Sequence, residues 1–126
     1  MKGSPLVLAA DVGGTTIAAG AVTAAGDVVV EERVPTHRDG PGQAVASLIA
    51  MLEAVRDGAE QLGHPVTGIG VGVPGPVDTA AGRICDHVPH VPELEGRPLA
   101  AELGERFGLP AFVDNDVNAL ALAEWM

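Results

Sequence analysis

The chain has 126 residues, with 7 basic and 17 acidic side chains and a formal net charge of −10. This length fits one compact domain and is too short for two full lobes with a cleft between them. The acidic balance argues against a nucleic-acid partner, because a duplex binder needs a basic surface that displaces counterions. A single cysteine, Cys85, excludes an internal disulfide and fits a reducing compartment.

Neither a secretion signal nor a membrane segment is predicted. The apolar run before Asp11 is too short for a signal peptide. No apolar run approaches the roughly 20 residues that a membrane helix needs. We therefore expect a cytoplasmic protein without a membrane partner.

The first third of the chain predicts three short strands, at residues 6–10, 17–23 and 28–34. The strands are rich in aliphatic residues and are separated by Gly- and Asp-containing turns. Short strands joined by tight turns form an antiparallel meander, so we expect one here.

A helix is predicted from Pro41 to Gly63, because apolar residues recur there at helical spacing. A strand at residues 67–73 follows, and every second residue in it is a glycine: Gly68, Gly70 and Gly72. Strand side chains alternate between the two faces, so one face of this strand is bare. Either a helix or a ligand must approach that face closely.

The last third begins with residues 74–98, which have no period and exceed the usual length of a structureless loop. A helix at 99–107 and a strand at 111–113 are predicted next. A final helix from Asn118 has no capping residue before Met126. We therefore expect that the chain is cut within a helix.

Residues 11–16 (DVGGTT) lie at the end of the first strand and could bind a phosphate. Two glycines let the backbone N–H groups approach an anion, and two threonines offer hydroxyl groups. The carboxylate of Asp11 could hold a hydrated Mg²⁺. On spacing alone, an ordinary hairpin turn is the favoured interpretation of the pattern.

Residues 70–75 formally match the dinucleotide-binding pattern G-x-G-x-x-G. That pattern requires a helix that opens at its third glycine, whereas residues 76–78 predict a turn. No Gly-Lys-Ser/Thr sequence occurs either, so a P-loop is excluded.

Asp114, Asn115 and Asp116 lie where a strand ends and a helix begins. Asp and Asn are favoured as helix N-caps. A carboxylate at that position also stays ionised and can accept a proton from a substrate hydroxyl. The residues alone leave capping and function open.

Cys85, His87 and His90 could ligate a metal. Their spacing matches no common zinc module and a fourth ligand is missing. Solvated loop histidines are the favoured interpretation.

Three stretches together resemble the ROK family (repressor, open reading frame, kinase), the glucokinase-like branch of the actin/hexokinase/Hsp70 ATPases. They are residues 11–16, 72–78 and 113–124. The resemblance implies an α/β, ribonuclease-H-like lobe with a mixed five-stranded sheet. Three antiparallel strands would be extended by parallel ones, with helices on both faces. Residues 1–126 would then be the N-terminal lobe of a ROK-type kinase, with the C-terminal lobe absent.

The same resemblance assigns roles to individual residues. It implies contacts with the ATP phosphates from Asp11, Gly13, Gly14, Thr15 and Thr16. Asp11 would also contact Mg²⁺ through water. It implies sugar contacts from Gly75, His90, Asn115 and Asp116, of which Asp116 would be the catalytic base.

Two departures from the family pattern bear on function. His90 stands where the family's sugar kinases usually carry a sugar-binding Asn, and histidine lacks the donor and acceptor pair of an amide. Thr16 stands where many members have Lys, which removes a charge near the phosphates.

We expect the N-terminal lobe of an ATP-dependent hexose kinase, inactive on its own. The missing lobe would carry the adenosine site and a structural zinc motif, and the full-length protein would be a homodimer. The alternative is a sugar-sensing ROK regulator that binds its ligand without phosphorylating it.

Overall fold

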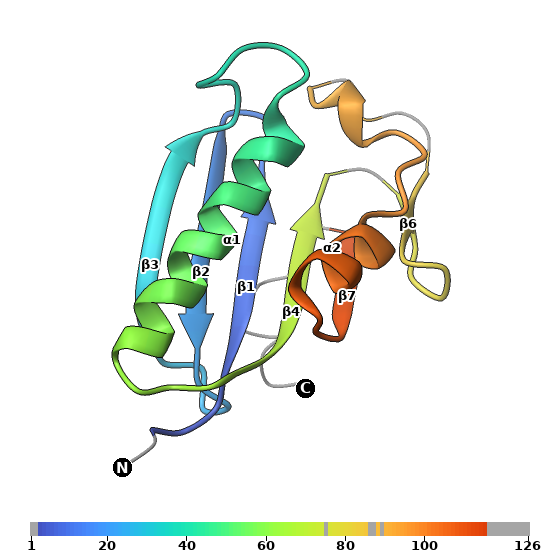
Figure 1. Cartoon of the computed structure of the whole chain (residues 1–126). Helices are drawn as coiled ribbons and strands as arrows, with labels where there is room; N and C mark the ends of the chain where they lie inside the picture. Colours follow the sequence, from blue (N-terminus) through green and yellow to red (C-terminus); the bar gives the residue numbers. More distant parts are fainter. Residues whose placement is uncertain (1–2, 75, 86–87, 89, 116–126) are drawn as a thin grey trace.

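A five-stranded mixed sheet lies at the centre of the computed structural model, which describes residues 3–74, 76–85, 88 and 90–115 (Figure 1). Its strands are β1 (Leu6–Val12), β2 (Thr16–Val22), β3 (Val28–Pro35), β4 (Val66–Val73) and β7 (Ala111–Asn115). Their order is β3-β2-β1-β4-β7. β1, β2 and β3 pair antiparallel, whereas β4 pairs parallel with both β1 and β7. The predicted meander and its parallel extension are confirmed.

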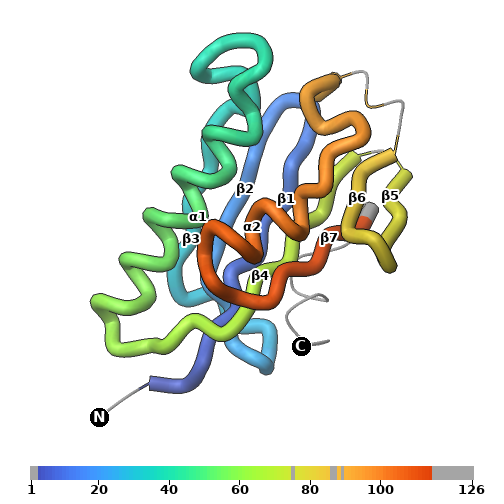
Figure 2. The backbone as a smooth tube through the Cα atoms, turned by 45° about the vertical axis from the view of Figure 1, so that its right-hand side comes forward, coloured from blue at the N-terminus to red at the C-terminus, as the bar shows by residue number. Residues whose placement is uncertain are grey.

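Two helices, α1 (Ala44–Gln61) and α2 (Leu99–Phe107), cover the same face of this sheet (Figures 1 and 2). The helix predicted from Asn118 lies outside the described residues. Among the helices that the structure describes, none has the length and apolar character needed to cross a membrane.

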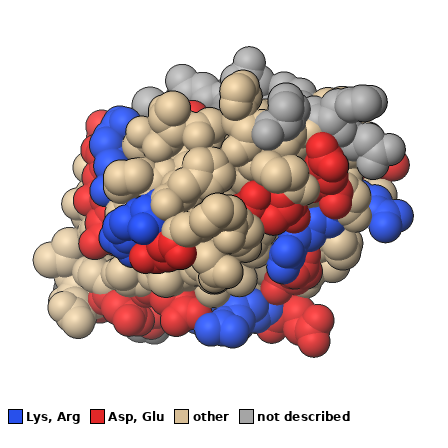
Figure 3. Space-filling view, turned by 90° about the horizontal axis from the view of Figure 1, so that it is seen from above, with Lys and Arg blue, Asp and Glu red and all other residues tan. Residues whose placement is uncertain are grey.

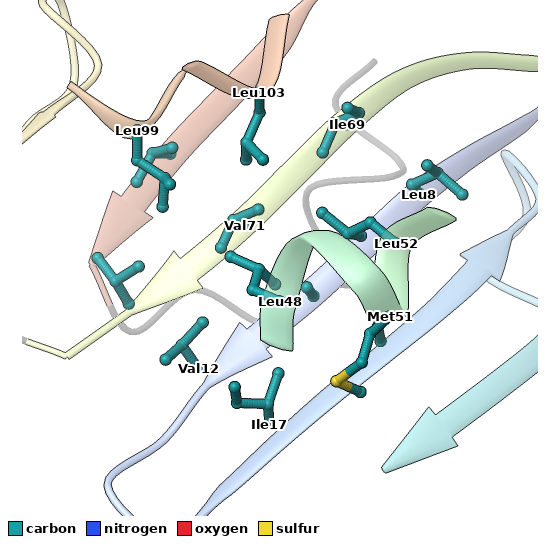
Figure 4. Close-up of a cluster of buried hydrophobic side chains, with 14 of the residues drawn as sticks. Leu8, Val12, Ile17, Leu48, Met51, Leu52, Ile69, Val71, Leu99 and Leu103 are labelled. Carbon is teal, nitrogen blue, oxygen red and sulfur yellow. The ribbon is translucent and has the colours of Figure 1, made fainter. Parts of the chain in front are cut away.

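The core between the helices and the sheet is aliphatic, as the low aromatic content requires. Leu52 of α1 lies over Leu8 of β1, Leu48 lies one helical turn away from Leu52, and Leu103 of α2 faces the same layer (Figure 4). All four side chains are fully buried. Burial of each such side chain contributes roughly 1.5–3 kcal/mol of transfer free energy.

The alternation along β4 gives its two faces different characters. Ile69, Val71 and Val73 belong to the core beneath the helices. Gly68 and Gly70 pair with Val7 and Ala9 of β1, which belong to a separate buried cluster. The predicted bare face is therefore the one opposite α1 and α2, and neither of these helices covers it.

Residues 74–98, expected to lack regular structure, contain a small hairpin and a short 3-10 helix. The hairpin is formed by β5 (Val77–Asp78) and β6 (Arg83–Ile84), and the helix is η1 (Pro92–Leu94). Elements of two or three residues are too short to produce a period in the sequence. The segment packs on the core through buried residues at irregular intervals: Ile84, Val88, Val91 and Leu94.

Two leucines at the same helix test this description of the core. Leu52 is fully buried beneath α1, whereas Leu62, just past the end of that helix, is 61% exposed. Leu52→Ala should lower the free energy of unfolding by about 2–5 kcal/mol, because it leaves a cavity. The matched Leu62→Ala should change it by less than about 0.5 kcal/mol. Urea unfolding measures both, and equal losses would contradict the packing described here.

Candidate functional site

The carboxyl ends of the parallel strands bring two aspartates onto one line across the sheet. Asp11 pairs with Gly72, and Gly72 pairs with Asp114. Since neighbouring strands lie about 4.8 Å apart, the two aspartate Cα atoms are about 10 Å apart. All three residues lie on the bare face, and the glycine between the carboxylates adds no side chain. Residues more than 100 positions apart in the sequence thus share one edge of the sheet.

The turn between β1 and β2 lies at the same edge. The Gly13 N–H donates to the Thr16 carbonyl oxygen at 2.9 Å and closes the hairpin. That N–H therefore points into the hairpin and is not available to a phosphate. Thr15 and Thr16 are exposed, so their side chains, rather than the Gly13 amide, are the groups that this turn offers to solvent.

Thr36 fixes the position of this turn from the end of β3. Its hydroxyl group donates to the Gly13 carbonyl oxygen at 2.7 Å, and its N–H donates to the Thr15 carbonyl oxygen at 2.9 Å. The Thr36 side chain is completely buried. Sequence analysis missed this residue, because nothing in the local pattern distinguishes a buried threonine after Pro35 from a solvated one.

His90 lies directly against the turn. A Cβ atom added at Gly14 would come within 3.1 Å of the His90 Cβ, closer than ordinary contacts allow. A side chain at position 14 would therefore require His90 to move by a few tenths of an ångström. The structure brings together two motifs that the sequence separates by 75 residues.

A second histidine contacts the backbone of residues 90–95, the His90 segment. The Nε2 atom of His37 lies 2.9 Å from the His90 carbonyl oxygen. A carbonyl can only accept, so Nε2 carries the proton in this bond. Sequence analysis does not single out His37, because its 53-residue separation from His90 gives no local indication of the contact.

The His90 segment is also bonded to the start of α1. Glu93 of η1 accepts a hydrogen bond from the Ala44 N–H at 3.0 Å. No side chain of the preceding residue caps this helix. The glutamate therefore satisfies one of the unpaired N–H groups at the helix start and places a negative charge at the positive end of the helix dipole.

The loop from Thr36 to α1 is anchored by Asp39. The buried hydroxyl group of Ser47 donates to Asp39 Oδ2 at 3.0 Å, and Arg38 Nε lies 3.5 Å from Oδ1. The hydrogen bond from Ser47 and, next, the neighbouring Arg38 lower the pKa of Asp39 from its ordinary value of 3.8. Around this edge, charges of both signs surround a surface that is mostly uncharged (Figure 3).

Several predicted site residues fall outside the described residues, namely Gly75, His87 and Asp116. Asp114 and Asn115 belong to strand β7, and the helix expected after them lies outside the described residues. Cys85 is exposed. Within the part of the chain that the structure describes, no group of three metal-ligating side chains gathers. The suggested Cys-His-His set includes His87 and so lies partly outside that part.

The groups at this edge suit a hydrated magnesium ion that accompanies a polyphosphate. Asp11 is exposed at the end of β1, and carboxylate oxygens are preferred Mg²⁺ ligands, usually with several waters retained. The exposed threonine hydroxyls are suited to phosphate oxygens. Position 72 carries no side chain that would fill the space between the two aspartates.

A model of the ROK family matches residues 7–126. Among curated proteins, N-acetyl-D-glucosamine kinase from Shigella flexneri is 36% identical over 114 residues, which cover 90% of this chain and 36% of the kinase. The chain therefore spans about a third of the length of the curated relatives it matches.

Solved structures of both kinases and a regulator share the fold. A ROK glucokinase from Streptomyces griseus, in complex with glucose and AMPPNP, is 30% identical with a TM-score of 0.73, over 90% of this chain and 34% of that one. A ROK transcriptional regulator, a homologue of the E. coli MLC protein, is 26% identical with a TM-score of 0.77. The match covers 95% of this chain and 30% of the regulator. The lobe described above is thus the ribonuclease-H-like lobe of actin-like ATPases.

The lowered pKa of Asp39 predicts how this loop responds to acid. The ionised carboxylate stabilises the folded state above pH 3.8, and this contribution is lost as the pH falls through the lower folded pKa. Asp39→Asn should therefore lower the Tm slightly at pH 7, and the difference from the wild type should disappear as the pH falls well below 3.8. Thermal unfolding across this range measures it. Asp57→Asn, at an exposed position of α1, is the control, and an Asp39→Asn deficit that persists at pH 2 would refute the prediction.

Proposed function

This chain belongs to the ROK family, and we propose on that basis that it is the N-terminal lobe of an ATP-dependent sugar kinase. The complete enzyme would transfer the γ-phosphate of ATP to a sugar hydroxyl group. The proposal is carried by one observation: the Gly13–Gly14 turn, the Asp11–Gly72–Asp114 line and His90 lie at one edge of the sheet. The chain spans 36% of its kinase relative, so we propose that a second lobe supplies the adenosine site and that this lobe alone is inactive.

On the nucleotide side, we assign the phosphates to the turn between β1 and β2. Thr15 and Thr16 would donate hydroxyl hydrogen bonds to phosphate oxygens, and Gly14 would allow their close approach. Asp11 would hold Mg²⁺ through water, and the ion would neutralise charge on the phosphates. Gly13 would contribute through the shape of the turn, since its N–H is already bonded to Thr16.

On the sugar side, we assign the base to Asp116 and sugar contacts to Gly75, His90 and Asn115. β7 ends at Asn115, so Asp116 directly follows the strand that carries Asp114. As base, its carboxylate would accept the proton of the attacking sugar hydroxyl. Phosphoryl transfer depends mainly on positioning and electrostatics, and groups attached to the ends of sheet strands are well placed for it.

A sugar-sensing regulator is the second candidate. The structural similarity to a ROK transcriptional regulator supports it, and so does His90 in the place of the usual Asn. A sensor would bind the sugar at the same edge without transferring phosphate. The exposed Thr15 and Thr16 beside Asp11 favour the kinase, because sugar binding alone does not require a phosphate site.

Replacement of the base tests catalysis directly. The complete gene product should phosphorylate at least one sugar in a panel of glucose, mannose and N-acetylglucosamine, with ATP as donor. Asp116→Asn should reduce kcat by about 10²–10⁴, the usual contribution of a general base. Asp27→Asn, in the exposed turn after β2, serves as the control and should leave kcat unchanged. Equal activity in both variants would remove Asp116 as the base, and sugar-dependent stabilisation without turnover would favour the sensor.

The role of His90 can be tested by restoring the amide. His90→Asn provides the donor and acceptor pair that a sugar hydroxyl uses, so the KM for the sugar should fall by about tenfold, or 1.4 kcal/mol. The KM for ATP should not change. His64→Asn, at the other end of the sheet, should change neither constant. A change confined to the KM for ATP would exclude His90 from the sugar site.

A further inference from the structure

The loop between β3 and α1, residues 36–43, contains one of the two buried polar side chains found among the described residues and is bonded by the other. Thr36 is fully buried and Ser47 is 3% exposed. Thr36 begins the loop and donates to the Gly13 carbonyl oxygen at 2.7 Å. Ser47 donates to Asp39 within the loop at 3.0 Å. A buried hydroxyl is costly unless it is bonded, so these bonds specify the position of the loop.

Neighbouring residues of this loop contact different parts of the site. Thr36 bonds the Gly13–Gly14 turn, through its hydroxyl group and through its N–H to Thr15. His37 donates from Nε2 to the His90 carbonyl oxygen at 2.9 Å. Two adjacent side chains thus hold the backbone of the phosphate turn and the backbone of the His90 segment.

The Gly13–Gly14 turn and the His90 segment also contact each other directly. Gly14 and His90 are in such close contact that a Cβ atom on the glycine would lie 3.1 Å from the His90 Cβ. Glu93 adds a bond from the same segment to the Ala44 N–H at the start of α1. Turn, loop and segment therefore form one bonded unit, in which residues 36 and 37 are the shared connection.

We propose that Thr36 and His37 are positioning residues, Thr36 for the nucleotide phosphates and His37 for the sugar. Neither would touch a ligand. Thr36 sets the backbone of the turn that carries Thr15 and Thr16, and His37 sets the backbone at His90. The inference rests on the proposed function and adds a separate role for each residue. Loss of the Thr36 hydroxyl group should affect nucleotide binding, and loss of the His37 ring should affect sugar binding.

The Thr36 arm uses the complete gene product with Mg²⁺–AMPPNP as the nucleotide probe. Thr36→Val keeps the shape of the side chain and removes the hydroxyl group. We expect a roughly tenfold weaker Kd by calorimetry and a similar rise in the KM for ATP, the size expected for one lost hydrogen bond. The KM for the sugar should stay unchanged. Thr36→Ser restores the donor and should bring nucleotide binding back to within about threefold of the wild type.

The matched control for this arm is Thr67→Val. The Thr67 hydroxyl group also donates to a backbone carbonyl, that of Leu6, at 3.4 Å, but at the opposite end of the sheet. Its loss should change the Tm without changing either KM. If Thr67→Val raises the KM for ATP as much as Thr36→Val does, the Thr36 effect is general destabilisation and the inference fails.

The His37 arm uses the sugar that the wild type phosphorylates. His37→Ala should raise the KM for that sugar by about tenfold and leave nucleotide binding unchanged, and His37→Gln, which retains a donor, should recover part of the loss. His64→Ala is the matched control, because His64 makes an equivalent 2.9 Å contact with the Ser4 carbonyl oxygen, far from the site. If His37→Ala weakens nucleotide and sugar binding equally, the two residues do not have separate roles and the inference is overturned.

Amide hydrogen exchange separates this inference from the proposed function. Thr36→Val should speed exchange in residues 13–16, and His37→Ala should speed it in residues 90–95, each without affecting the other segment. Unchanged exchange in both variants would overturn the inference even if the wild type is a kinase. A wild type that binds neither AMPPNP nor sugar would overturn the proposed function and, with it, the roles given to Thr36 and His37.

Discussion

The pairing of β1 in two directions is the constraint on which the rest of the site depends. β1 is antiparallel to β2 on one side and parallel to β4 on the other. The antiparallel pairing places a tight turn at the carboxyl end of β1. The parallel pairing places the carboxyl ends of β4 and, through it, β7 at the same edge. A turn suited to phosphates and the strand ends that carry acidic side chains are thereby brought together by backbone hydrogen bonds alone.

Side-chain size then separates the two faces of the sheet. Ile69, Val71 and Val73 fill the space beneath the helices, while the alternate positions of β4 carry glycine. A one-residue shift of β4 would exchange the two sets and remove the aliphatic side chains from beneath the helices. The buried aliphatic layer therefore fixes the register that aligns Asp11 with Gly72 and Gly72 with Asp114. The packing of aliphatic side chains on one face of β4 thus determines which residues line up on the other face.

The sequence was sufficient for the features that depend on local pattern. Aliphatic runs bounded by turn residues predict the main strands, helical spacing predicts α1, and the glycines at 68, 70 and 72 predict the bare face. The hairpin at Val77–Asp78 and Arg83–Ile84 could not be predicted, because two-residue strands contain no period. The contacts of Thr36 and His37 were also invisible. They join residues 23 and 53 positions apart, and a threonine or histidine in a loop is ordinarily solvated.

The shared fold of kinases and a regulator means that the backbone does not decide between catalysis and sensing. The TM-scores to a glucokinase and to a transcriptional regulator differ little, at 0.73 and 0.77. Within this lobe, side chains at the edge of the sheet are therefore where a difference has to be sought. Exposed hydroxyls at Thr15 and Thr16 beside Asp11 add nothing to the stability of the core, and a buried hydroxyl at Thr36 is used to hold the turn that presents them. The proposed kinase function would account for this arrangement, because a domain that positions a polyphosphate needs hydroxyl donors held at such a turn.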